Sequence, residues 1–135
     1  MYRVFVPLDT DMDRAMKQVA YVSALPCASE AVEAVLAHSL SDEERSAPSD
    51  MQRVDRVDTV KAAQEQLAEA DITVDTVALS SPPSEGILSR LTEAGSDEVV
   101  LGGRKRSPTE KAILGSVTQT VILNATIPVT VTGGE

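Results

Sequence analysis

The chain has 135 residues, 42% of them hydrophobic and 2% aromatic, so its core must be built from Val, Leu, Ile, Ala and Met. Acidic residues outnumber basic ones by 21 to 12, and the formal net charge of -9 argues against partners such as nucleic acids and anionic membranes. With Cys27 and His38 as the sole residues of their types, one chain can form neither a disulfide nor a Cys/His zinc site.

This length and composition predict one globular domain over residues 1–135. No leader-like segment precedes Val4 and no apolar run reaches membrane-spanning length, so we expect a cytoplasmic protein. The surface is rich in acids and holds only four lysines, which is the composition expected in a high-salt cytoplasm. Salt-dependent folding would test that expectation.

The first quarter of the chain predicts a strand followed by a helix. Residues 3–8 are mostly apolar and predict a buried strand, in which Pro7 marks the end of pairing because it lacks an N–H group. Asp9-Thr10-Asp11 is a typical helix start. Apolar residues at helical spacing from Met12 to Val22 predict a helix that Pro26 ends.

The middle of the chain continues the alternation. Residues 33–40 predict a second strand, and the polar residues 41–54 predict a flexible loop. An apolar stripe over 57–68 predicts a helix. The β-branched segment 72–79 predicts a strand, and the Ser/Pro-rich turn at 80–84 leads into the next helix.

The last part of the chain predicts two more helices and two more strands. A helix carries apolar residues over 87–94 and ends at Gly95, which suits a C-terminal cap. A short buried strand at 98–101, a helix with its apolar face at 117–122 and a strand at 127–132 follow. The alternation predicts an α/β fold, a doubly wound (Rossmann-like) five-stranded parallel sheet with helices on both faces.

The connection from the fourth strand to the last helix carries the clearest functional signal. Ligands of such sheets bind beyond the carboxyl ends of the strands, where the strand order reverses. The chain leaves the strand through Gly102-Gly103 and enters the helix at Gly115-Ser116, and four basic residues lie between them: Arg104, Lys105, Arg106 and Lys111. The first amides of the helix, those of Ser116, Val117 and Thr118, are expected to form an anion site, which predicts a phosphate ligand.

These segments resemble the universal stress protein family. The resemblance covers nearly the whole chain and is carried by Val4-Phe-Val-Pro-Leu-Asp9, Leu36-Ala-His38, Ser81-Pro-Pro-Ser-Glu-Gly-Ile-Leu, Val99-Val-Leu-Gly-Gly-Arg-Lys-Arg-Ser, Leu114-Gly-Ser-Val-Thr-Gln and Ile127-Pro-Val-Thr-Val. It implies a five-stranded parallel sheet and a homodimer that pairs through the last strand, 127–132. It also implies that the chain belongs either to the members that bind ATP or to those that do not.

The ATP-binding members carry Gly, two residues, Gly, nine residues, and then Gly with Ser or Thr. Gly102 matches the first position and Gly115-Ser116 the last two, whereas Lys105 stands at the second glycine. Pro7 and Asp9 match residues that touch adenine and ribose, and Ser39 stands where binders often have Val. The resemblance implies a site for ATP, alone or with Mg²⁺, at Pro7, Leu8, Asp9, Ser39, Gly102, Gly103, Lys105, Gly115, Ser116, Val117 and Thr118.

Three functions therefore stay open. The leading hypothesis is a nucleotide-binding regulatory protein that acts as a homodimer with an unknown protein partner; no general base is evident, so any ATP hydrolysis would be slow. The second is a dimeric interaction module that does not bind ATP, which the residues Lys105 and Ser39 favour. The third, less favoured, is a Mg²⁺-dependent phosphatase of the haloacid-dehalogenase type using Asp9 and Asp11, because helix capping by Asp9 or Asp11 is the preferred explanation of that pair.

Overall fold

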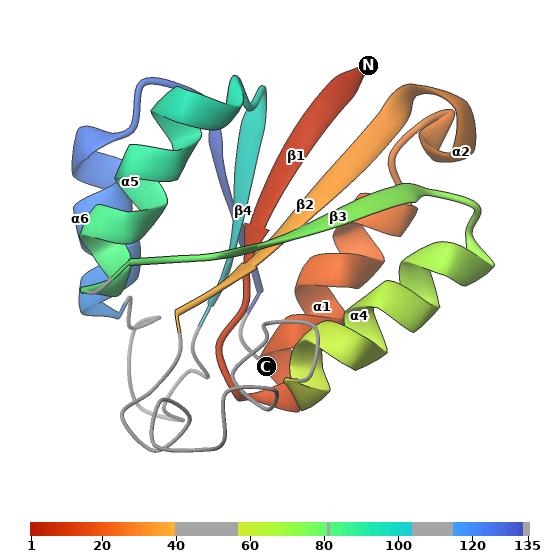
Figure 1. The fold of residues 1–135 in the computed structure, drawn as a ribbon, viewed down its shortest axis with the longest axis horizontal. Coiled ribbons are helices and arrows are strands. Elements are labelled where there is room, and N and C mark those ends of the chain that lie inside the picture. Colours follow the sequence, from red (N-terminus) through yellow and green to blue (C-terminus); the bar gives the residue numbers. More distant parts are fainter. Residues whose placement is uncertain (40–56, 81, 104–114, 134–135) are drawn as a thin grey trace.

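The computed structural model describes residues 1–39, 57–80, 82–103 and 115–133. It contains a sheet of five parallel strands in the order β3-β2-β1-β4-β5, which confirms the predicted doubly wound fold (Figure 1). The chain forms β1 and β2 first, turns outward to β3, and then crosses to the other side of β1 for β4 and β5. The strands are β1 (Tyr2–Pro7), β2 (Val32–His38), β3 (Thr73–Ala78), β4 (Glu98–Gly102) and β5 (Val129–Thr132).

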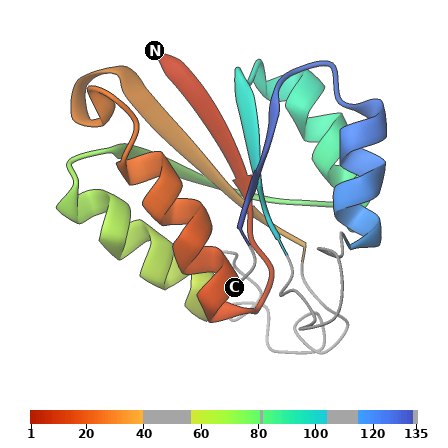
Figure 2. The same ribbon diagram turned by 180° about the vertical axis from the view of Figure 1, so that it is seen from behind.

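Helices cover both faces of the sheet (Figures 1 and 2). One face carries α1 (Met12–Ser23) and α4 (Asp58–Glu69), and the other carries α5 (Pro83–Ala94) and α6 (Ser116–Asn124). A short helix, α2 (Ala28–Ala31), leads into β2. None of the helices within the described ranges is long and apolar enough to cross a membrane.

The central strand β1 supplies both cores because successive side chains of a strand point to opposite faces. Val4 and Val6 are fully buried in the core beneath α1 and α4, whereas Phe5 is fully buried beneath α5 and α6. Full burial of a side chain of this size stabilises the fold by about 1.5–3 kcal/mol. The alternation therefore fixes the register of β1 between the two helical layers.

The element boundaries differ from the predictions where backbone chemistry decides them. The last strand was expected from residue 127, but β5 begins at Val129 because Pro128 has no N–H to donate; its carbonyl accepts from the Val99 N–H at 3.0 Å. Helix α2 was not predicted. Its N-cap, Cys27, has a φ of 56°, a left-handed conformation that a sequence pattern does not reveal. The predicted loop at 41–54 lies outside the described residues.

Candidate functional site

A cavity of about 340 Å³ lies beyond the carboxyl ends of the strands. This volume falls at the lower end of the range of roughly 300–1,000 Å³ that small-molecule sites occupy. Among the predicted site residues, those that line the cavity are Pro7, Leu8, Asp9, Ser39, Gly102, Gly115, Ser116, Val117 and Thr118. The structure thus brings together segments that are more than one hundred residues apart in the sequence.

The cavity lies where β1 and β4 separate. The two strands pair only through Val4–Glu98 and Phe5–Val99, and then diverge. Gln18 of α1 bridges them beyond that point: its Nε2 donates to the Pro7 carbonyl at 2.8 Å and to the Val100 carbonyl at 3.0 Å. Gln18 is only 2% exposed. Its amide therefore supplies, inside the core, the hydrogen bonds that these two carbonyls do not receive from a neighbouring strand.

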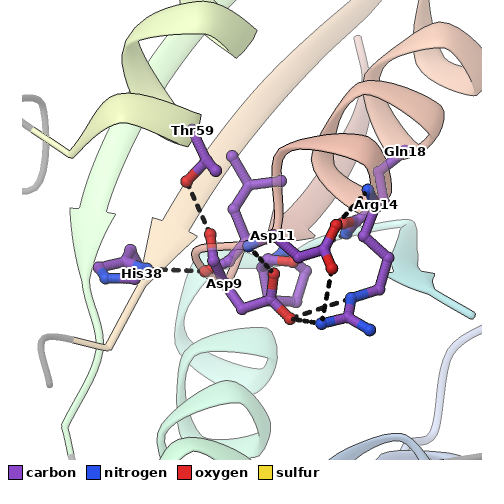
Figure 3. Close-up of polar contacts among 8 residues, drawn as sticks. Asp9, Asp11, Arg14, Gln18, His38 and Thr59 are labelled. Carbon is purple, nitrogen blue, oxygen red and sulfur yellow. Dashed lines mark hydrogen bonds and ion pairs between the residues drawn. The ribbon is translucent and has the colours of Figure 1, made fainter. Parts of the chain in front are cut away.

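Asp9 forms the polar centre of the β1 side of the cavity (Figure 3). Its Oδ1 accepts from the Asp11 N–H at 2.9 Å. Its Oδ2 accepts from two donors of Arg14, Nε at 3.1 Å and Nη2 at 2.8 Å. Asp11 in turn is the N-cap of α1, since its Oδ1 accepts from the Arg14 N–H at 3.0 Å, as the capping interpretation of the Asp9–Asp11 motif expected.

Three hydrogen bonds hold the backbone at Leu8 and Asp9 (Figure 3). The Leu8 N–H donates to the Ala37 carbonyl at 2.7 Å, and the Leu8 carbonyl lies 2.8 Å from Nδ1 of His38. The Asp9 carbonyl accepts from Oγ1 of Thr59 at 2.7 Å. His38 and Thr59 are 3% and 1% exposed, so these contacts belong to the core and hold the strand end in one position.

The opposite wall of the cavity is the start of α6. Gly115 is its N-cap, and no side chain of the described residues caps the helix. The first intrahelical bond joins the Gln119 N–H to the Gly115 carbonyl at 3.0 Å, so the N–H groups of Ser116, Val117 and Thr118 precede the helical ladder. An uncapped helix start on a cavity wall presents amide donors and the positive end of the helix dipole to that cavity.

The glycines of the β4 end differ in their surroundings. A Cβ on Gly102 would lie 2.8 and 2.9 Å from Cγ and Cδ of Arg14, so only glycine lets the arginine stem pass there without displacement. Gly103 does not line the cavity; its N–H donates to the Thr132 carbonyl of β5 at 3.0 Å. Lys105 lies outside the described residues.

Sequence reasoning missed several residues that line the cavity, and two of them are polar side chains of α1, Arg14 and Gln18. Gln18 had a detectable signal, because it shares the buried face of the helix with Ala15, Val19 and Val22. A buried amide on an apolar stripe needs partners, and backbone carbonyls at a strand end supply them. Arg14 had no such signal. The remaining missed residues are Thr10, His38, Leu79, Pro83, Ile87 and Leu101.

The model of the universal stress protein family matches residues 1–133. A universal stress protein from Archaeoglobus fulgidus is 27% identical with a TM-score of 0.78, covering 98% of this chain and 99% of that one. The universal stress protein from the same organism in complex with dAMP is 21% identical, with a TM-score of 0.73 and 98% of each chain covered. A family protein from Arabidopsis thaliana with AMP bound is 12% identical, with a TM-score of 0.68, covering 100% of this chain and 93% of that one. No curated protein matches the chain.

Proposed function

The chain belongs to the universal stress protein family, and on that premise we propose that it binds an adenine nucleotide, ATP in particular, as a non-catalytic regulatory protein. The observation that carries the proposal is the start of α6, which no side chain of the described ranges caps, on the wall of a cavity whose other side holds a carboxylate. A nucleotide has the complementary groups, phosphates at one end and sugar hydroxyls further along. The AMP and dAMP complexes of proteins with this fold support the same ligand class.

Each side of the cavity has a proposed role. Pro7, Leu8 and Ser39 would flank the base, and Asp9 would accept from the ribose. Gly102 would line the path of the phosphates, and the amides of Ser116, Val117 and Thr118 would hold the terminal ones. Mg²⁺, where present, would neutralise the phosphates of ATP.

We also propose that the protein acts as a homodimer. The outer edge of β5 ends the sheet, and an exposed strand edge favours pairing with another chain. Ile122 and Leu123 of α6, the helix that precedes β5, are 41% and 80% exposed, which is apolar area that a second copy would cover. If this surface were the whole function, the chain would be an interaction module without ATP, the alternative that Lys105 and Ser39 favour.

Substitution of Ser116 by Asp tests the nucleotide proposal. The new carboxylate would lie at the start of α6, where it interacts favourably with the helix dipole and repels phosphate. We expect Ser116→Asp to weaken ATP binding about tenfold or more, because an anion at a helix start is stabilised by up to about 2 kcal/mol. Its free energy of unfolding should stay equal to that of the wild type or rise. Calorimetric titration with ATP and AMP measures the first quantity, and urea unfolding the second.

Thr126→Asp is the matched control, since it adds the same charge at an exposed position that does not line the cavity. It should leave ATP affinity within about twofold of the wild type, a change below about 0.5 kcal/mol. Bound ligand also raises the melting temperature by mass action. If millimolar ATP and AMP leave the melting temperature of the wild type unchanged, the nucleotide proposal is wrong. A Lys105→Gly variant that gains ATP binding from none would then favour the interaction module.

A further inference from the structure

We propose that Arg14 determines the sugar specificity of the cavity. Its guanidinium uses acceptor positions of the Asp9 carboxylate, so that Asp9 can accept from one sugar hydroxyl rather than two. The cavity would accordingly take ribonucleotides and 2′-deoxyribonucleotides with similar affinity. This inference rests on the proposed nucleotide site and concerns its sugar end. It follows from the number of acceptor positions that the protein itself already uses on one carboxylate (Figure 3).

A carboxylate offers about four lone-pair positions, two on each oxygen. Oδ2 of Asp9 accepts from both Nε and Nη2 of Arg14, at 3.1 and 2.8 Å, so both of its positions are used. Oδ1 accepts from the Asp11 N–H at 2.9 Å, and within the part of the chain that the structure describes its other position stays open. A vicinal ribose diol needs two acceptor positions, one for each hydroxyl, whereas a single hydroxyl needs only the one that remains.

The arginine is held in this arrangement by its stem as well as by its charge. Cγ and Cδ of Arg14 pass over Gly102, within 3 Å of where a side chain would begin. Nη2 lies 3.7 Å from Oδ2 of Asp11, a second ion pair on the same side. The side-on approach through Nε and Nη2 directs Nη1 away from Asp9, so the guanidinium offers the sugar no replacement for the lost acceptor.

Asp9 cannot avoid the arginine by moving its backbone. The Asp9 carbonyl is bonded to Thr59, and the adjacent Leu8 is bonded on both its N–H and its carbonyl. The Asp9 side chain is nevertheless 55% exposed and lines the cavity, so the free position of Oδ1 is accessible to a ligand. The carboxylate is thus fixed in place, open to the cavity and short of acceptor capacity.

The test compares AMP with 2′-deoxy-AMP, because their ratio of dissociation constants reports the second sugar hydroxyl alone. We expect a ratio within about twofold for the wild type. Arg14→Met keeps an unbranched stem over Gly102 and removes the competing donors. In this variant the ratio should rise to about tenfold in favour of AMP, since a hydrogen bond to a charged acceptor is worth about one order of magnitude in affinity.

Two further variants separate this role from a structural one. Arg90→Met removes the same charge from an exposed ion pair of α5, with Glu93 at 3.9 Å, and should keep the wild-type ratio. Arg14→Lys keeps the charge without the fork that fills Oδ2, so an intermediate ratio is expected. It also serves as the test variant should Arg14→Met fail to fold. A merely structural role of Arg14 would change both affinities together and leave the ratio unaltered.

The outcomes distinguish the two proposals. If AMP binds the wild type tenfold more tightly than 2′-deoxy-AMP, or if the ratio does not change on substitution of Arg14, the role of Arg14 is refuted while the nucleotide site stands. If AMP, 2′-deoxy-AMP and ATP all fail to bind the wild type, the proposed function falls and this inference with it.

Discussion

Two carboxylates at opposite ends of the sheet each accept several hydrogen bonds, but they differ in burial. Glu98, at the amino end of β4, is 4% exposed and accepts from the hydroxyls of Tyr2 at 2.8 Å, Tyr21 at 2.7 Å and Thr130. Asp9, beyond the carboxyl end of β1, has a side chain that is 55% exposed and accepts from Arg14 and the Asp11 amide. The first group ties β1, α1, β4 and β5 together, whereas the second lines the cavity.

The difference shows how burial separates a structural carboxylate from one that is available to a ligand. A buried carboxylate is destabilising unless protein donors replace its water, and Glu98 has three of them. A half-exposed carboxylate keeps water on its open side, and a ligand can take the place of that water. The two carboxylates therefore differ both in burial and in the end of the sheet at which they lie.

The largest expected effect comes from removing the buried carboxylate. Glu98→Ala leaves three hydroxyls without their acceptor and opens space in the core, so we expect a loss of about 2–4 kcal/mol in the free energy of unfolding. Urea unfolding measures it. If the two ends of the sheet are independent, the shift in melting temperature that we expect from ATP should be the same in this variant and in the wild type. A loss of that shift would contradict the comparison.

A smaller effect is expected from removing the hydrogen bond between Thr59 and the backbone of Asp9. Thr59→Val keeps the shape of the side chain and removes the bond to the Asp9 carbonyl, so the free energy of unfolding should fall by about 1 kcal/mol. Thr92→Val is the matched control, because Thr92 is an exposed residue of α5 whose hydroxyl donates to the Leu88 carbonyl of the same helix at 3.4 Å. Chemical denaturation of both variants gives the comparison. Equal losses would show that the contact at Asp9 contributes nothing of its own.

The smallest effect is a pH dependence of the Glu98 group. Partial burial, and then the hydrogen bond to Glu98, raise the pKa of Tyr2 from its ordinary value of about 10 to about 12. The bond to Glu98 also raises the pKa of Tyr21. The folded state therefore keeps a proton that the unfolded state loses, so this stabilisation is complete below pH 10 and is lost as the pH rises through about 12.

Urea unfolding at intervals between pH 9 and 12 measures that decline. Tyr2→Phe should reduce the slope of the free energy of unfolding against pH in this range and lower that free energy slightly at neutral pH. An unchanged slope in Tyr2→Phe would assign the pH dependence to other groups. The nucleotide-induced shift at neutral pH should be the same in Tyr2→Phe and the wild type, because Tyr2 begins β1 and the cavity lies beyond its other end.

Much of this architecture was predictable because it depends on local patterns. Alternating strand and helix periodicities specify a parallel sheet, and the paired glycines with a following helix start indicate where an anion would bind. Gln18 and Arg14 were not predictable in their roles, because their partners come from β1, β4 and the turn after β1. Such partners are defined only when the strand order is known. Cys27 illustrates the same limit for backbone conformation.

The Gln18 bridge has a consequence for how a ligand would enter. Its amide donates to one backbone carbonyl of each strand beyond the point where β1 and β4 pair, so both carbonyls are satisfied with the strand ends apart. Binding of the proposed ligand would then require no separation of these strand ends, which would lower its entropic cost. The β1–β4 side of the cavity is thus preorganised by one helical side chain that lies between the two strand ends.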